Sequence, residues 1–279
     1  MPYIKKIAAI HDISCFGRAS LTTIIPILSV MKYQVCPMPT AVLSTHTGGF
    51  GKPAIEDLSD FMQMAKDHWN SLSIDFKCLY SGYLGNSNQV KFVKEFIQDF
   101  KKNETIIVVD PVMADDGELY SSMDNKMVEG MRELIREAHI ITPNITEACF
   151  LLDKEYKSKF TQEEIENMLL DLSNMGPEKV VITSVPSIEG NDYMDTVAYD
   201  KNNHEFFRSI NNRIDASYPG TGDAFASVLI GGILQGDKLE KALERACSFI
   251  KEGIEYSNQF DYPRNYGMLL EEVLYKLME

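Results

Sequence analysis

Short runs of β-branched residues alternate with longer amphipathic stretches over most of this 279-residue chain. The runs have the length and composition of buried strands, and the stretches between them have the periodicity of helices with one apolar face. We expect strands at residues 4–10, 34–37, 77–81, 105–110, 139–142 and 179–183, and helices at 54–70, 89–101, 125–137 and 161–174. Because a helix that joins two strands makes them parallel, this order predicts an α/β fold. We expect a mostly parallel central sheet with helices on both faces.

The last third of the chain departs from this alternation. Residues 194–199 and 205–210 flank the polar segment 200–203, a pattern that predicts an antiparallel hairpin. Helical patterns then follow at residues 221–235, 238–257 and 265–278, which predict a C-terminal helical segment. Neither a repeat nor a low-complexity linker interrupts the sequence, so we expect a single domain over residues 1–279.

The balance of charge narrows the classes of partner. The chain has 27 Lys and Arg residues against 41 Asp and Glu residues, a formal net charge of −14. Nucleic acids and anionic membranes attract lysine and arginine, so we expect no nucleic-acid and no membrane partner. The five cysteines form no C-x-x-C pair, which favours free thiols in a reducing compartment. No apolar run suits a signal peptide or a membrane span, so we expect a soluble cytoplasmic protein.

A glycine-rich turn precedes the helix expected from residue 221. Gly220 and Gly222 would let the backbone approach a ligand, and the free N–H groups of the first helical turn would face an anion. Asp223 lies beside this cradle, where it could accept the proton of a hydroxyl that attacks the γ-phosphate of ATP. The alternative is an ordinary glycine-rich turn in which Asp223 only complements the helix dipole.

Oxygen-bearing side chains follow two of the expected strands. Asp110 ends one strand, and Asn144 and Glu147 follow the next, three residues apart at a helix start. These are ligand types that Mg²⁺ uses directly or through water. The alternative for Asn144 and Glu147 is a capping box, and both roles are compatible. The P-loop, dinucleotide-binding and protein-kinase motifs are absent from the sequence, so ATP would bind in another way.

Taken in order, these motifs resemble a known superfamily. GTGD at residues 220–223, DPV at 110–112 and N-x-x-E at 144–147 look like the ribokinase superfamily of small-molecule kinases. The chain is more closely similar to the pyridoxal/pyridoxamine kinase branch at 43–48, 81–83, 141–144 and 182–184, which read LSTHTG, SGY, ITPN and ITS. The resemblance covers residues from about 7 to about 253. It implies a ribokinase-like three-layer fold.

The resemblance also implies an activity and a set of site residues. The activity is ATP-dependent phosphorylation of the 5′-hydroxymethyl group of pyridoxal, pyridoxine or pyridoxamine, a step of vitamin B6 salvage. Asp223 would be the base, and the N–H groups of Gly220, Thr221 and Gly222 would stabilise charge on the transferred phosphoryl group. The implied substrate-binding residues are Ser14, His46, Thr47 and Tyr83. The implied ATP-binding residues are Asp110, Asp115, Thr142, Asn144, Glu147, Thr183, Ser184, Ile214, Tyr218, Thr221 and Gly222.

Cations complete the expected site. The acidic side chains of Asp110, Asp115, Glu147 and Asp223 would repel a polyphosphate unless cations intervened, so we expect Mg²⁺ dependence. The resemblance implies that Asp110 and Glu147 organise Mg²⁺, partly through water. It further implies that oxygens near Thr142 and Thr183 hold a monovalent cation such as K⁺, and that the protein forms a homodimer.

The first loop departs from the pattern of pyridoxal kinases. They commonly carry a Ser-His and a Gly-Asn pair there, whereas residues 11–20 of this chain read HDISCFGRAS. Asp12 and Ser14 resemble the Asp-x-Ser of hydroxymethylpyrimidine kinases, which act in thiamine biosynthesis. That activity is the alternative among enzymes. A noncatalytic protein that binds a pyridine compound or a nucleotide is the alternative outside them.

Overall fold

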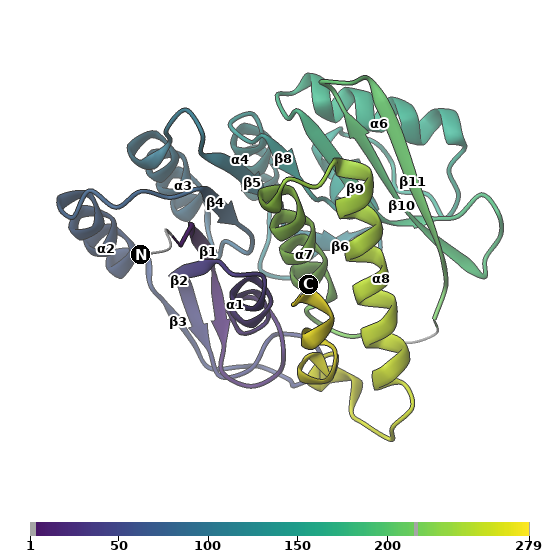
Figure 1. Cartoon of the computed structure of the whole chain (residues 1–279), viewed down its shortest axis with the longest axis horizontal. Helices are drawn as coiled ribbons and strands as arrows, with labels where there is room; N and C mark the ends of the chain where they lie inside the picture. The colour runs from purple at the N-terminus through teal and green to yellow at the C-terminus, as the bar shows by residue number, and fades with distance from the viewer. Residues whose placement is uncertain (1–3, 215–216, 279) are drawn as a thin grey trace.

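The computed structural model describes residues 4–214 and 217–278, which build a nine-stranded sheet between two layers of helices (Figure 1). Six strands run parallel, namely β1 (Lys6–Ser14), β2 (Gln34–Leu43), β4 (Cys78–Ser81), β5 (Ile106–Val109), β8 (Ile140–Ile141) and β9 (Lys179–Pro186). Antiparallel strands complete both edges, with β3 (Ile55–Asp57) at one and β10 (Tyr193–Asp200) and β11 (Glu205–Asn212) at the other. The order across the sheet is β11–β10–β9–β8–β5–β4–β1–β2–β3. The expected α/β class is confirmed.

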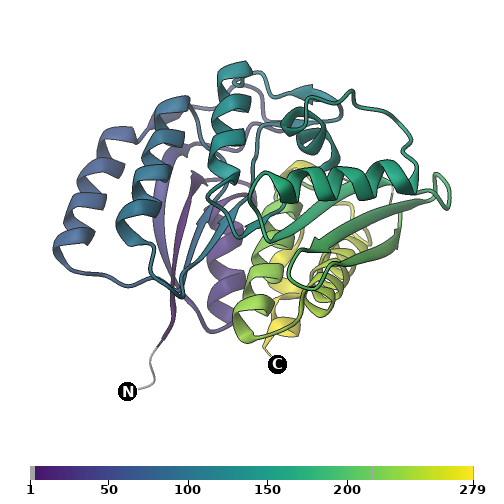
Figure 2. The ribbon, with the colours of Figure 1, turned by 90° about the horizontal axis from the view of Figure 1, so that it is seen from above.

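Two hydrophobic cores lie on opposite faces of the sheet, and Figure 2 shows from above the helices that cover the two faces. One is covered by α2 (Ser59–Ser71), α3 (Ser87–Phe100), α4 (Asn125–Ile135), α5 (Ile145–Leu151) and α6 (Gln162–Asn174). The other is covered by α1 (Leu21–Val30), α7 (Thr221–Gln235) and α8 (Leu239–Ser257). Successive side chains of a strand point to opposite faces. In β1, Ala8 and Ile10 therefore enter the first core, whereas Ile7 and Ala9 enter the second.

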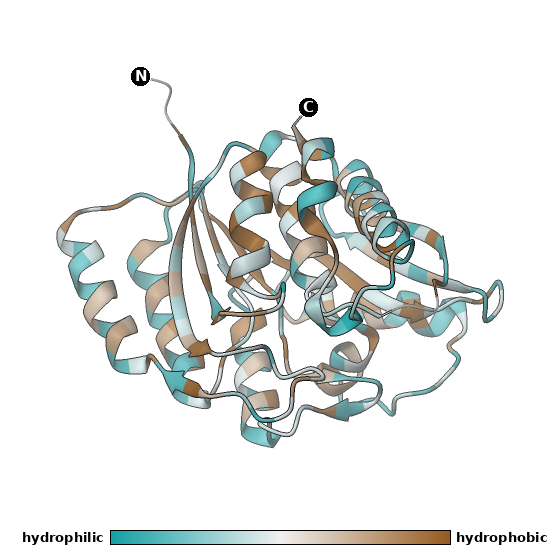
Figure 3. Cartoon of the chain, turned by 90° about the horizontal axis from the view of Figure 1, so that it is seen from below, coloured by the Kyte–Doolittle hydropathy of each residue, from teal (hydrophilic) through white to brown (hydrophobic). Residues whose placement is uncertain are grey.

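Burial on both faces explains why the central strands read as continuous apolar runs rather than alternating ones. Figure 3 shows the apolar residues along these strands and on the helix sides next to them, with polar residues at the outer turns. Within residues 4–214 and 217–278, none of the helices combines the length and apolar composition needed to cross a membrane.

The prediction was partly wrong for one helix and wholly wrong for another. The helix expected over 54–70 begins only at Ser59, because Ile55–Asp57 pairs with β2 as an edge strand. The helix expected over 265–278 is replaced by three short 3₁₀ helices, η1 (Arg264–Tyr266), η2 (Leu270–Glu272) and η3 (Leu274–Leu277). Gly267 has a φ of +86°, which a right-handed helix cannot include, and lies directly against Arg18. The expected hairpin is confirmed.

Candidate active site

The site forms where the parallel strands end and α7 begins. Asp12 and Ser14 lie at the end of β1, Asp110 follows β5, and Asn144 follows β8. Asn144 also forms a parallel bridge with Thr183 of β9. The carboxyl ends of parallel strands are where open α/β sheets bind ligands, because loops from several strands meet there.

Gly220 fixes the entry into α7. It is the N-cap residue with a φ of +79°, and a Cβ at this position would lie 2.1 Å from the carbonyl oxygen of Arg18. Only glycine fits this close approach without displacing the backbone. A Cβ built on Gly222, in contrast, meets no atom within 4 Å, so this glycine faces open space beside the helix N-terminus.

Asp223 is held in place by a neighbouring loop. The backbone N–H of Ser20 donates a hydrogen bond of 2.8 Å to Oδ2 of Asp223. Burial and the negative charge of Asp12 raise the pKa of Asp223 to about 7, against the effect of the Ser20 hydrogen bond. A carboxyl that titrates near neutral pH is suited to act as a general base. The geometry thus favours this role over simple complementation of the helix dipole.

Asp110 and Glu147 form a buried acidic pair. They are 7% and 3% exposed. Burial and the charge of Asp223 raise the pKa of Asp110, and burial and the charge of Asp110 raise the pKa of Glu147. Two carboxyl groups that resist ionisation together are a binding site for positive charge.

Glu147 is also the capping residue of α5. Its Oε2 accepts a hydrogen bond of 2.9 Å from the N–H of Asn144, and its Oε1 accepts one of 3.0 Å from the N–H of Met113. Asn144 in turn accepts from the N–H of Glu147 at 2.8 Å, so the capping box is complete. Because both carboxylate oxygens are engaged, Glu147 is suited to contact a metal through water.

The oxygen ligands at this position suit Mg²⁺, which does not need a site made of protein ligands alone. Among the residues that the structure describes, no three His, Cys, Asp or Glu side chains gather as a metal-binding group. Mg²⁺ usually keeps several waters and is bound by one or two carboxylates together with substrate phosphates. The Thr142 hydroxyl lies near enough to Asp110 to lower its pKa, yet it is buried without a hydrogen bond within 3.5 Å to any described residue. Its oxygen is therefore available to a further ligand.

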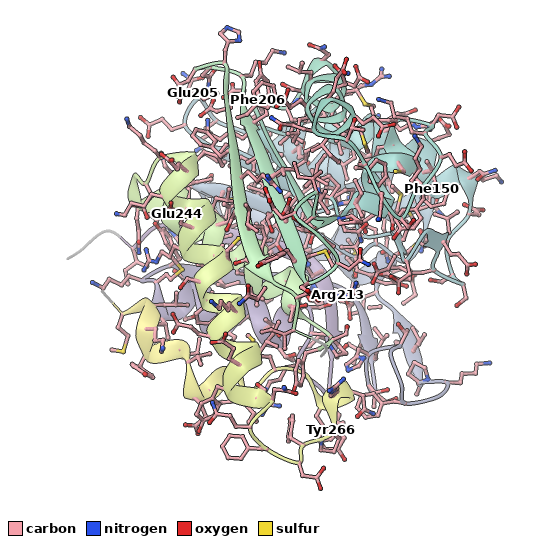
Figure 4. The ribbon with its side chains drawn as sticks, turned by 90° about the vertical axis from the view of Figure 1, so that its right-hand side faces the viewer. Phe150, Glu205, Phe206, Arg213, Glu244 and Tyr266 are labelled. Atoms are coloured by element: carbon pink, nitrogen blue, oxygen red, sulfur yellow. The ribbon has the colours of Figure 1, made fainter. Side chains whose placement is uncertain are left out.

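A cavity of about 360 Å³ opens beside the start of α7. Its lining includes six of the residues expected to bind ATP, namely Thr183, Ser184, Ile214, Tyr218, Thr221 and Gly222. Phe225, Ile250 and Ile254 add an apolar wall, and Arg213 and Lys251 add positive charge. Figure 4 shows Arg213 at the lower end of the β10–β11 hairpin, and Glu205 and Phe206 at the opposite end, where β11 begins.

Sequence reasoning missed the residues of this wall. The apolar stripe of α8 was indistinguishable from core packing, and Arg213 carried no local signal. Tyr120 was also missed. Burial and then the charges of Glu147, Asp115, Asp110 and Asp223 raise its pKa, which places its hydroxyl among the acidic residues of the site.

The expected substrate-binding residues lie on other segments and do not line this cavity. Ser14 donates a hydrogen bond of 3.3 Å to Asp12, and the Tyr83 hydroxyl lies 3.4 Å from that of Ser122. Thr47 is exposed. His46 Nδ1 accepts from the N–H of Gly48 at 3.1 Å, so Nε2 must donate to the carbonyl oxygen of Asn265 at 2.7 Å. Both ring nitrogens are used, and His46 is therefore suited to hold a loop rather than to transfer a proton.

Residues 262–271, which we call the C-terminal clasp, hold the substrate-side loops. Arg18 donates its N–H to the carbonyl oxygen of Tyr266 at 3.0 Å, and its side chain binds Glu271 and Tyr262. The ring of Tyr266 packs 4.8 Å from that of Phe16 and 5.9 Å from that of Phe50, centroid to centroid. Figure 4 shows Tyr266 below the end of the hairpin. The clasp lies where a regular helix was expected.

Asp115 lies apart from the cavity lining. It is an exposed residue of β6 (Ala114–Asp115), which pairs with β7 (Glu118–Leu119) in a separate two-stranded sheet. The same segment reaches the acidic pair through the carbonyl oxygen of Ala114, which accepts a hydrogen bond of 2.8 Å from the Asn144 side chain. The structure therefore places β6 beside Asn144.

Comparison with known proteins assigns this architecture to a family. Residues 29–268 match the family described as phosphomethylpyrimidine kinase. The pyridoxal kinase of Bos taurus is 29% identical over 218 residues, which cover 73% of this chain and 69% of the bovine one.

Solved structures agree over almost the whole length. The crystal structure of pyridoxal kinase from Lactobacillus plantarum has a TM-score of 0.89 at 29% identity, and the match covers 99% of this chain and 97% of that one. A "putative phosphomethylpyrimidine kinase" from Bacteroides thetaiotaomicron, in an orthorhombic form with pyridoxal, has a TM-score of 0.96 at 45% identity and coverage of 99% and 96%. The chain thus belongs to the phosphomethylpyrimidine kinase family, in the pyridoxal kinase branch of the ribokinase-like superfamily.

Proposed function

We propose that this protein is an ATP-dependent kinase that phosphorylates the 5′-hydroxymethyl group of a vitamin B6 vitamer. The observation that carries the proposal is Asp223, a partly buried carboxyl with its pKa raised to about 7 beside the open face of Gly222. The names of the relatives and the pyridoxal in the crystals of the Bacteroides protein support the choice of acceptor. The protein acts in the cytoplasm as one ribokinase-like domain spanning residues 1–279.

In the reaction, Asp223 accepts the proton of the substrate hydroxyl. The hydroxyl oxygen forms a bond to the γ-phosphorus as the bond from that phosphorus to the β,γ-bridging oxygen breaks, and ADP leaves. The N–H groups of Gly220, Thr221 and Gly222 face the transferred group and stabilise its charge. Asp110 and, through water, Glu147 would hold Mg²⁺, which would supply positive charge to the phosphates when bound.

The other expected residues orient the two substrates. Thr183, Ser184, Ile214 and Tyr218 line the nucleotide cavity. Asp115 and Asn144 border the phosphates, and the oxygens of Thr142 and Thr183 hold a monovalent cation such as K⁺. The unpartnered Thr142 hydroxyl supports that cation role. On the pyridine side, Ser14, Thr47 and Tyr83 contact the ring, and His46 fixes the loop around them. A homodimer stays a prediction, which sedimentation of the purified protein measures.

Phosphorylation of hydroxymethylpyrimidine is the second candidate. The description of the matching family and the hydrogen-bonded Asp12 and Ser14 of the first loop favour it. The two candidates share the mechanism at Asp223 and differ in the acceptor. Release of ADP from Mg·ATP with K⁺ present distinguishes them, with pyridoxal, pyridoxine, pyridoxamine and hydroxymethylpyrimidine as separate acceptors. We expect turnover to be fastest with one of the three B6 vitamers, with a product heavier by one phosphoryl group.

The variant Asp223→Asn tests the chemical role. We expect kcat to fall by about 10³-fold because the general base is lost, with binding of ATP and vitamer retained. The matched control is Asp60→Asn, at an exposed aspartate in the first turn of α2, which should keep the wild-type kcat. Wild-type turnover by Asp223→Asn would reject the base. Saturable binding without ADP formation by the wild-type protein would instead indicate a noncatalytic binding protein.

A further inference from the structure

Ser20 contacts two carboxylates at once, the buried Asp12 and the partly buried Asp223. Its backbone N–H donates to Oδ2 of Asp223 at 2.8 Å, and its hydroxyl donates to Oδ1 of Asp12 at 2.5 Å. Ser14 donates to the other oxygen of Asp12 at 3.3 Å. The end of β1, the start of α1 and the first turn of α7 are thereby joined through one residue.

The hydroxyl of Ser20 does not cap the helix that follows it. Ser20 is the N-cap residue of α1, a position where serine normally accepts a hydrogen bond from the first turn of its own helix. Here the side chain makes no capping hydrogen bond and binds Asp12 instead. Helix α1 therefore lacks the stabilisation of a side-chain cap, and the hydroxyl of Ser20 forms the link to Asp12 instead.

The backbone of Ser20 is also unusual. Its φ is +51° and its ψ is −132°, a conformation that residues with a side chain rarely adopt. This conformation directs the N–H of Ser20 toward Asp223 while its hydroxyl reaches Asp12. A bridge between Ser20 and Ile13, and the contact of Arg18 with Gly220, hold the loop on both sides.

The two carboxylate oxygens of Asp223 have different surroundings. Oδ2 is occupied by Ser20, whereas Oδ1 accepts no hydrogen bond from any residue within 4–214 and 217–278. Oδ1 is therefore the oxygen left for the substrate hydroxyl. Its direction depends on where Ser20 holds Oδ2, and Asp12 holds Ser20.

We propose that Asp12 is a positioning residue of the reaction, which acts through Ser20 to aim the carboxylate of Asp223 at the acceptor hydroxyl. This inference rests on the proposed kinase function. Asp12 is only 5% exposed, and its two carboxylate oxygens accept hydrogen bonds from Ser20 and Ser14. A buried carboxylate is costly to keep, so a link to the base gives a reason for its presence.

The first test separates the link from the residues that it joins. Ser20→Ala keeps the N–H that Asp223 accepts but removes the hydroxyl that binds Asp12. We expect kcat to fall about 10- to 100-fold, because the base loses its fixed direction, while KM for ATP stays the same. Asp12→Ala should give the same loss, and Asp12→Asn, which keeps an acceptor oxygen, should recover much of it. Ser29→Ala, at an exposed serine of the same helix, is the control and should be unchanged.

The second test asks whether the effect passes through Asp223. In the Asp223→Asn background, Ser20→Ala should lower the residual kcat no further, because residues that act as one unit are not additive. An undiminished loss in that background, or a wild-type kcat in Ser20→Ala, would overturn the inference while leaving the kinase function intact. Absence of turnover in the wild-type protein would overturn the kinase function itself. Melting temperatures and binding of ADP report whether each variant is folded.

Discussion

Two glycines of the same turn should respond to alanine in opposite ways. Gly220 has a φ of +79°, and a Cβ there would lie 2.1 Å from the carbonyl oxygen of Arg18. The left-handed conformation costs alanine about 1–2 kcal/mol, and overpacking against a backbone atom adds about 1–3 kcal/mol. Gly220→Ala should therefore lower the free energy of unfolding by about 2–5 kcal/mol.

Gly222→Ala should instead stabilise the fold and harm the reaction. Gly222 lies in the first turn of α7, and a Cβ there meets nothing within 4 Å. Alanine in a helix gains about 0.5–1 kcal/mol over glycine, because less backbone entropy is lost on folding. The added methyl would project where the phosphates approach the N–H groups, so we expect kcat/KM for ATP to fall about 10²-fold.

Thermal unfolding and steady-state kinetics of both variants measure these effects. The matched control is Gly51→Ala, because Gly51 has a φ of +78° and open space around its Cβ position. It reports the cost of the backbone conformation alone, and the excess cost in Gly220→Ala is the clash with Arg18. The reasoning is refuted if Gly220→Ala and Gly51→Ala are equally stable, or if Gly222→Ala keeps the wild-type kcat/KM.

Three further outcomes follow from the site. Because the pKa of Asp223 is raised to about 7, kcat/KM should rise with pH up to about 7 and level off above; a profile that stays flat down to pH 5 would exclude this base. Burial raises the pKa of Asp110 above its ordinary 3.8. The contribution of Asp110 to the free energy of unfolding is therefore fully present below pH 3.8 and is lost as the pH rises through the raised pKa. Asp110→Asn should thus raise the melting temperature of the ligand-free protein more at pH 8 than at pH 5 while removing Mg²⁺-dependent turnover; equal shifts would contradict the burial argument. Tyr266→Ala, which removes the ring packed on Phe16 and Phe50, should raise KM for the vitamer about 3- to 10-fold and leave KM for ATP unchanged, as initial rates would measure.

Most of the fold could be predicted from patterns of neighbouring residues in the sequence. The central strands could be located because burial on both faces leaves continuous apolar runs, and the helix Thr221–Gln235 has the expected bounds residue for residue. The errors arose where distant segments decide the structure. Residues 55–57 become a strand by pairing with β2, and Gly267 takes a conformation required by contact with Arg18.

The same distinction between local patterns and distant contacts applies to the residues of the site. The glycine cradle and the capping box of Asn144 and Glu147 are patterns of consecutive residues, so the sequence could indicate them. The link from Asp12 through Ser20 to Asp223 joins residues more than 200 positions apart, and no short pattern signals it. Arg213 enters the nucleotide cavity through the placement of the hairpin, which only the assembled sheet determines.

The C-terminal clasp has a consequence for synthesis on the ribosome. All nine strands of the sheet end before residue 213, whereas the loops at Arg18 and His46 also bind residues 262–271, which are made later. A nascent chain can therefore assemble its sheet while the loops at Arg18 and His46 still lack their contacts with the clasp. Such a chain would complete the contacts of these loops only after the clasp has left the exit tunnel.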